Sequence, residues 1–395
     1  MNKVRSKIVI ISLLLLSLIL VVSTLFGSTV AENDDPRQEL TDDIIDNTQE
    51  LDLDLLQQWV DGLDSSFFGS LKETIIAIAQ GQRQPSFDQL IQVFVNQLFS
   101  AVTRVLPIIV SIVGISLLCS LLSSLTGGFL SNPTKQLIGF VSYCAVAVIV
   151  LTRTFSLVKN TSEVVGGVKQ FMELVFPVLL TIITVVGGAN SGAVFQPMMS
   201  VLTTTITSFV VELILPAVVA VIVFTMISSL SDGIKLKKLT EFFNSGIKYA
   251  LTAVFSLFVT FLTAQGLTGG IIDTVSIKTA KFAMQSYVPI VGGYLSDGFD
   301  LMMASFVLIK NSLGVVSLFA LLIFIASPIV NVIVFSLGLK LASGIIEPLG
   351  DTKISKMLYD LSKNVNILLA IILGVAFMFI VTIMLIIFAC NLGVV

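Results

Sequence analysis

Charged side chains that interrupt long apolar stretches are the residues of this sequence with the clearest capacity for chemistry. Glu212, Lys310 and Glu347 lie within or at the edge of such stretches, and Asp351 follows shortly after the last of them. An ionisable group inside a membrane span is costly and usually faces a bundle interior or a water path. We therefore expect buried polar roles for Glu212 and Lys310, whereas Glu347 is close enough to the end of its run to reach the membrane interface.

No catalytic constellation accompanies these charges. The chain has no histidine, which removes the commonest general base and metal ligand. It also lacks a phosphate-binding Gly-Lys-Ser/Thr loop and a Gly-x-Ser-x-Gly nucleophile elbow. Cys119, Cys144 and Cys390 lie in apolar runs and share no close spacing. We expect no enzymatic activity, no cofactor, no metal site and no nucleic-acid partner.

Composition identifies the environment that these residues occupy. Of 395 residues, 55% are hydrophobic and 12% are charged, whereas soluble proteins have about a quarter charged residues. A helix of about 20 apolar residues crosses the hydrocarbon core of a bilayer. The runs that reach or approach this length cover residues 105–125, 136–152, 213–230, 246–265, 301–346 and 364–389. The sequence predicts an all-α, polytopic bundle in the lipid bilayer, with about seven to nine crossings.

Some of these apolar runs leave the path of the chain open. Residues 301–346 are long enough for two crossings with a break near Ser327 and Pro328. Residues 174–188 and 198–211 are short, so they are either full spans or a pair of half-helices that meet at residues 188–192. Half-helices and re-entrant segments are tolerated where protein or a water-filled cavity covers the backbone. The side of the membrane reached by the C-terminus therefore stays open.

The N-terminus has the layout of a secretory signal peptide. Lys3, Arg5 and Lys7 precede an apolar run over residues 8–22, and small residues follow up to Ala31. We expect a signal peptide over residues 1–31; an uncleaved membrane anchor is the alternative. Either arrangement delivers the following region outside the cytoplasm.

That following region, residues 32–104, is acidic at its start and amphipathic further on. Residues 32–64 contain twelve carboxylates and one basic residue, Arg37, which is typical of a solvated segment. Leu55, Leu56, Trp59 and others recur at helical spacing and predict a short amphipathic helix. Its tryptophan has three alternatives: an anchor at the membrane interface, a docking surface for a partner, or packing onto the next helices.

The rest of the chain shows signs of an internal duplication. Two spans in residues 105–160 precede one copy over residues 161–270 and another over residues 271–395. In each copy a Lys, a Met and a Pro share the same spacing and are followed by a glycine pair: Lys169, Met172, Pro177, Gly187 and Gly188 in the first, and Lys281, Met284, Pro289, Gly292 and Gly293 in the second. Coincidence within apolar sequence is the alternative. Repeats recur in transporter folds, and glycines let membrane helices approach closely.

Several short motifs carry a resemblance to a known family. They occur in one order along the mature chain: TAKF at residues 279–282, VPIVGG at 288–293, LIKN at 308–311 and EPLGD at 347–351. With them the sequence resembles the stage III sporulation protein AE family. Glu347 is a departure, because an uncharged polar residue is expected there.

The resemblance implies a protein of endospore-forming bacteria, multi-pass in the mother-cell membrane that surrounds the forespore. It implies a part in a multi-protein channel between mother cell and forespore, with other stage III sporulation membrane proteins as partners. The family offers no established catalytic or binding residues to carry over. Two other functions remain: a self-contained secondary transporter, favoured by the duplication and the intramembrane charges, and a membrane enzyme, which the sequence supports least.

Overall fold

The computed structural model describes residues 34–63, 68–83, 87–125, 132–186, 189–230, 236–287 and 292–389. These residues form helices and short connections, with no strand among them. The chain divides into two units, residues 1–42 and 43–395. Of the first, the described part is the beginning of helix α2 (Asp34–Glu50). The expected signal peptide lies outside the described residues, and all that follows concerns the second unit.

Short helices form the N-terminal part of this unit. After the end of α2 come α3 (Asp54–Asp61) and α4 (Leu71–Ala79). Ser70 begins α4 as an N-cap, because its hydroxyl accepts a hydrogen bond from the backbone N–H of Glu73 at 3.4 Å. Leu56 and Val60 of α3 are buried, as the apolar spacing predicts, whereas Leu55 of the same predicted apolar face is exposed. Helix α4 packs against the long helix α10 described next.

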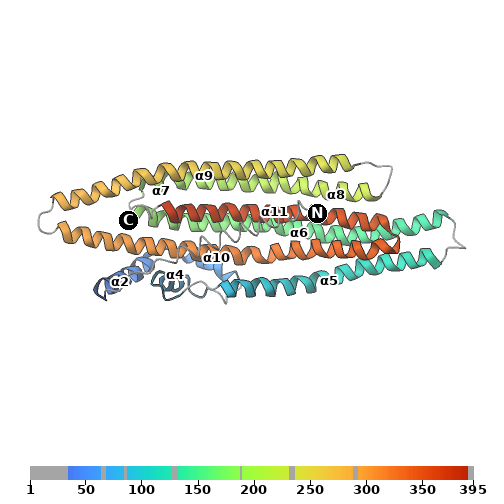
Figure 1. The fold of residues 1–395 in the computed structure, drawn as a ribbon, viewed down its shortest axis with the longest axis horizontal. Helices are drawn as coiled ribbons and strands as arrows, with labels where there is room; N and C mark the ends of the chain where they lie inside the picture. Colours follow the sequence, from blue (N-terminus) through green and yellow to red (C-terminus); the bar gives the residue numbers. More distant parts are fainter. Residues whose placement is uncertain are drawn as a thin grey trace. The chain divides into compact units, whose positions relative to one another are not determined.

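Six long helical segments follow, and each is long and apolar enough to cross a membrane. They run back and forth with short connections between them (Figure 1). The segments are α5 (Phe87–Leu125), α6 (Asn132–Val185), α7 (Ala189–Phe209) continuing through the π-helix η1 (Val210–Ile214) into α8 (Leu215–Leu230), α9 (Lys237–Tyr287), α10 (Gly292–Ile346) and α11 (Thr352–Ala389). The predicted all-α polytopic bundle is thereby confirmed.

Two helices explain why the described residues hold six such segments when we expected seven to nine crossings. Helix α10 continues through Pro328, so the expected break near Ser327 and Pro328 is wrong. Helix α6 joins residues 136–152 and 174–185 into one helix of 54 residues, which is about 80 Å long at 1.5 Å per residue. The stretch 174–185 is therefore the end of a long helix, and residues 198–209 are the second half of α7.

The continuity of α10 follows from its place in the core. Most of this helix is buried, and it packs against α5, α6, α9 and α11. A proline in a helix removes one N–H donor, and packed neighbouring helices stabilise the segment around it. The same close packing depends on glycine at two positions. A Cβ at Gly314 would lie 2.5 Å from Cδ1 of Ile387 on α11, and one at Gly374 would collide with the Phe255 ring on α9.

The helix connections fall at two ends of the bundle (Figure 1). At one end α5 meets α6, α8 meets α9 and α10 meets α11. Hydrogen bonds tie these connections together: Ser120 on α5 donates to the Leu349 carbonyl at 2.6 Å, and Tyr143 on α6 donates to the Met226 carbonyl on α8. Lysines of three helices lie towards this end, which we call the basic end: Lys237, Lys238, Lys340, Lys353 and Lys356.

Candidate functional site

Lys310 is fully buried in the first half of α10. Its Nζ donates a hydrogen bond to the carbonyl oxygen of Ile387 at 2.8 Å. Ile387 lies in the last turn of α11, where carbonyls have no partner within the helix and the helix dipole is negative. The ammonium thus meets a partner of opposite polarity inside the bundle, and the functional role of Lys310 stays a prediction.

The helix around Lys310 carries further polar atoms into the core. Ser305, Ser312 and Ser317 are buried on α10. Ser305 accepts a hydrogen bond from the Nδ2 of Asn47 at 3.0 Å, which links α10 to the end of α2. The side-chain oxygen of Asn311 is buried without a hydrogen-bond partner among the described residues. This part of α10 therefore holds the ends of α2 and α11 by polar contacts, one turn from the close approach at Gly314.

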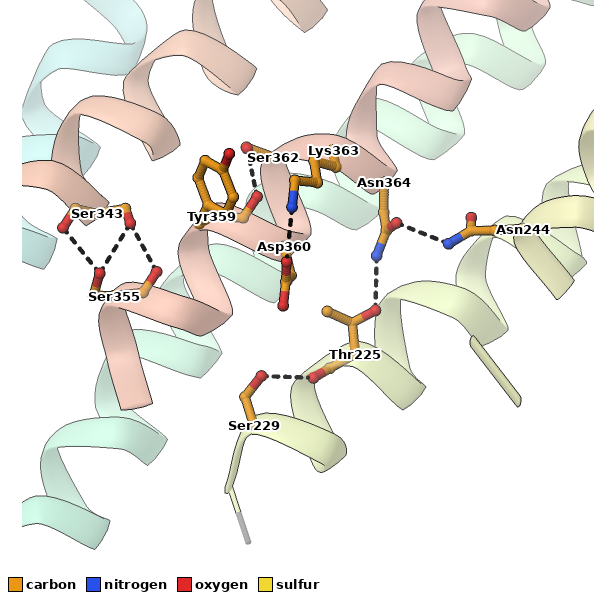
Figure 2. A network of polar contacts seen from close by, with 10 residues as sticks. All are labelled: Thr225, Ser229, Asn244, Ser343, Ser355, Tyr359, Asp360, Ser362, Lys363 and Asn364. Carbon is orange, nitrogen blue, oxygen red and sulfur yellow. Dashed lines mark hydrogen bonds and ion pairs between the residues drawn. The ribbon is translucent and has the colours of Figure 1, made fainter. Parts of the chain in front are cut away.

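A second polar cluster joins three helices near the basic end (Figure 2). Asn364 on α11 is almost fully buried, and its Nδ2 donates to the Thr225 hydroxyl on α8 at 2.7 Å. Its Oδ1 accepts from the Nδ2 of Asn244 on α9 at 3.1 Å. Because amides can donate and accept together, one side chain connects α8, α9 and α11. We call Asn364, Asn244 and Thr225 the amide cluster.

Serine hydroxyls join α10 to α11 in the same region. The hydroxyl oxygens of Ser343 and Ser355 lie 3.0 Å apart, and Ser343 also donates to the Ser355 carbonyl at 2.8 Å. One to two turns away, Ser336 donates to the Ser362 carbonyl at 3.0 Å. Small side chains allow the helices to approach, and their hydroxyls hold the contact.

The two acidic candidates at the basic end have different surroundings. Asp351 precedes α11, and its Oδ1 accepts from the backbone N–H of Ile354 at 3.2 Å, as an N-cap does. Gly350 before it has a φ of 91°, a left-handed conformation that favours glycine at this turn. Glu347 begins the short helix η2 (Glu347–Leu349) and is exposed. The position of Glu347 agrees with the expected place at the end of its run.

Glu212 lies in the π-helix η1 and is exposed. The expected burial of Glu212 within this chain is therefore wrong. An apolar run shows how deep a residue lies along a helix, but it does not show which face carries it, and a π-turn rotates the helix faces on either side. Lys310 and Glu212 thus have opposite settings although the sequence presents both in the same way.

The glycine pairs are only partly described. Gly187 and Gly188 lie outside the described residues. Gly292 and Gly293 begin α10, and the space around them is not among the described features. The structure therefore leaves the proposed close packing at both pairs as a prediction.

The sequence interpretation did not identify the amide cluster or the serines that join α10 to α11. The sequence did contain one indication of the amide cluster, because Asn364 is a polar amide at the start of the apolar run 364–389. The serines and threonines gave no signal, since such hydroxyls also bond to their own helix, as Thr225 does to the Val221 carbonyl at 2.7 Å.

Trp59 packs onto the long helices. Its ring stacks on Phe171 of α6 with centroids 4.0 Å apart and lies 5.0 Å from Phe324 of α10. Phe171 stacks in turn on Phe379 of α11 at 5.2 Å. Of the three alternatives for the tryptophan, the structure has packing onto the next helices, and this contact attaches α3 to the bundle.

The chemistry of these contacts is that of helix association and not of bond making. Amides, hydroxyls and one ammonium donate to acceptors on neighbouring helices. Across the part of the chain that the structure describes, no group of three or more His, Cys, Asp or Glu side chains is placed to hold a metal ion.

Comparison with known proteins connects this architecture to a family. The sequence matches the family described as stage III sporulation protein AE over residues 69–390. It is 23% identical to stage III sporulation protein AE of Bacillus subtilis (strain 168) over 339 residues, which cover 86% of this chain and 84% of that protein. No solved structure matches. The chain therefore belongs to the stage III sporulation protein AE family.

Proposed function

We propose that this protein is an integral membrane component of the multi-protein channel that joins mother cell and forespore during endospore development. Membership of the stage III sporulation protein AE family is the observation that carries the proposal. The six apolar helices support a permanent place in the membrane. The polar contacts among the described residues hold helices together, which fits a scaffold or wall of a larger apparatus. Its proposed partners are other stage III sporulation membrane proteins.

The orientation in the mother-cell membrane is part of this proposal. The basic end carries lysines at the starts of α9 and α11, and short loops rich in lysine and arginine stay in the cytoplasm. Because α5 runs towards the basic end, α4 belongs on the opposite, extracytoplasmic side (Figure 1). We propose the same side for the acidic region that precedes α4 in the sequence. The signal-like start of the sequence favours the same orientation. With six alternating segments, α11 ends on the extracytoplasmic side as well.

The duplication supplies a place for a conduit or a partner helix. In each proposed copy a glycine pair lies before or at the start of a long helix that runs towards the basic end: before α7, which continues into α8, in the first copy, and at the start of α10 in the second. Each copy then returns by a helix that begins with lysines, α9 or α11. Asn244 of the first copy bonds to Asn364 of the second. We infer a seam between the copies in which the glycine pairs admit a partner helix.

Deletion of the gene in an endospore-forming host tests the proposal. We expect heat-resistant spores to disappear and late forespore reporters to fall after engulfment, with both restored by the wild-type gene. The matched control is a deletion complemented by a variant in the acidic, exposed end of α2. Normal spore yield and normal late reporters in the deletion strain would contradict the proposed role.

A self-contained secondary transporter is the second candidate, and one observation favours it. Glu212 places a carboxylate in a π-turn inside the candidate span Met199–Leu230, and both π-turns and intramembrane carboxylates are frequent at functional sites. Solute uptake by the purified protein alone in liposomes, lost in Glu212→Gln, would favour this function. An absence of uptake together with the deletion phenotype would exclude it.

A further inference from the structure

Two arginines lie at the same level of two neighbouring helices, and neither has an acidic partner among the described residues. Arg104 on α5 and Arg153 on α6 each lie 21 residues from the helix end at the α5–α6 connection, and because the two helices pack against each other the like charges repel. Arg104 is exposed and its Nε donates to the Ser100 carbonyl of its own helix at 3.1 Å. Arg153 is half-buried, and its Nε is buried without a hydrogen-bond partner among the described residues. The ion pairs found in the described part of the chain involve other residues.

The depth of this arginine pair is set by the hairpin that carries it. Helix α5 continues for 21 residues from Arg104 to its end at Leu125, and α6 reaches Arg153 21 residues after its start at Asn132. At 1.5 Å per residue each arm is about 30 Å long, which equals the thickness of the hydrocarbon core. If the α5–α6 connection lies at one membrane surface, both arginines lie at the opposite surface, at the level of the lipid phosphates.

The surface on both sides of the pair is apolar. Val102 and Leu106 are exposed on α5, and Val148 and Phe155 are exposed on α6. A soluble anion gains nothing from such surroundings, whereas a phospholipid presents acyl chains beside its phosphate. Two guanidinium groups can share one phosphate through charge-assisted, bidentate hydrogen bonds, which relieve their mutual repulsion.

We propose that Arg104 and Arg153 bind the phosphate group of an anionic phospholipid, whose acyl chains cover the exposed apolar side chains of α5 and α6. The ligand fixes the two helices at the end of the hairpin away from its connection. A carboxylate from a second protein is the competing ligand, and the absence of a saturable effect of phosphatidylglycerol would overturn the lipid proposal in its favour.

Lipid-dependent thermal stability of the purified full-length protein in detergent tests this site. The probes are phosphatidylglycerol, phosphatidylcholine and sodium phosphate, titrated into delipidated protein. We expect phosphatidylglycerol to raise the thermal midpoint in a saturable way, and the other two to have little effect. The double variant R104Q/R153Q should weaken the apparent Kd for phosphatidylglycerol by about tenfold or more, because two charged hydrogen-bond donors are lost.

Lys159→Gln is the matched control. It removes a positive charge from α6, but from an exposed side chain that already pairs with Glu163 at 3.7 Å, so its lipid affinity should equal that of the wild type. Arg104 is exposed, so the single variant R104Q decides the question if the double variant fails to fold. Equal affinity of wild type and R104Q for phosphatidylglycerol, or equal stabilisation by phosphatidylcholine, would overturn the proposal. Stabilisation by sodium phosphate at the same phosphate concentration would replace the lipid by a soluble anion.

Discussion

Replacing Asn364 with leucine removes the central side chain of the amide cluster without a large change in volume. Asn364→Leu breaks the bonds to Thr225 at 2.7 Å and to Asn244 at 3.1 Å. The Thr225 hydroxyl keeps its bond to the Val221 carbonyl. The side-chain N–H of Asn244 loses its acceptor, and its Oδ1 is already buried with no hydrogen-bond partner in the described part of the chain. The cost therefore falls mainly on Asn244.

The magnitude follows from hydrogen bonds between membrane helices. Such bonds contribute about 0.6 kcal/mol on average and up to about 1.7 kcal/mol, so losing two lowers the free energy of unfolding by about 1 to 3 kcal/mol. Removing both amides leaves no unpaired polar group at the α9–α11 contact, so the second substitution can leave the free energy of unfolding nearly unchanged. We therefore expect the double variant N244L/N364L to be no less stable than N364L alone.

Reversible unfolding of the purified protein in mixed micelles measures these free energies. The fluorescence of Trp59, the single tryptophan of the chain, reports the loss of its stacking on Phe171. Asn331→Leu is the control, because Asn331 is also buried on a long helix but donates to the Ser327 carbonyl of its own helix at 2.9 Å. We expect N331L to cost less than N364L. Additive costs of N244L and N364L, or equal costs of N364L and N331L, would refute the reasoning.

Four further predictions concern other contacts. Gly314→Leu should lower the thermal midpoint of the protein in detergent, because overpacking against α11 costs about 1–3 kcal/mol. Gly344→Leu on the same helix is the control, because open space surrounds Gly344. Equal thermal midpoints of the two variants would contradict this prediction. Lys310→Glu should reduce the amount of protein in the membrane, because it places an acid at the negative end of α11, and Lys310→Arg should reduce it less. Trp59→Ala should speed cleavage of the N-terminal region by added protease about fivefold or more, since each lost ring contact contributes about 0.5–1.5 kcal/mol; unchanged cleavage would show that the stacking does not hold α3. Gly293→Leu should abolish spore maturation at normal protein levels, because the side chain would block the proposed close packing at the glycine pair. A normal spore yield would show that Gly293 has no role beyond the start of its helix.

The sequence predicted the features that depend on solvation along the chain. An apolar run of about 20 residues is long enough for a helix to cross the hydrocarbon core, and the six runs that reach or approach this length all lie in the long helices. Lys310 was also predictable, because a bare ammonium in that setting requires an acceptor, although the Ile387 carbonyl itself was not.

Features that depend on packing were not predictable in this way. In the sequence alone Pro328 suggests a helix break, but α10 packs against helices on several sides and continues through the proline. Glu212 is exposed because the face of a helix depends on where its neighbours lie and, here, on a π-turn. The amide cluster brings Asn244 and Asn364 together across 120 residues of chain, and no local pattern specifies such a pair.

Purification from sporulating cells in mild detergent, followed by mass spectrometry of what accompanies the protein, tests the central proposal most directly. If the protein is part of the channel between mother cell and forespore, other stage III sporulation membrane proteins should accompany it in fixed ratio, and they should be absent from a parallel purification of an unrelated multi-pass protein. A protein that purifies alone, and that transports a solute by itself in liposomes, would contradict the channel proposal and favour the transporter.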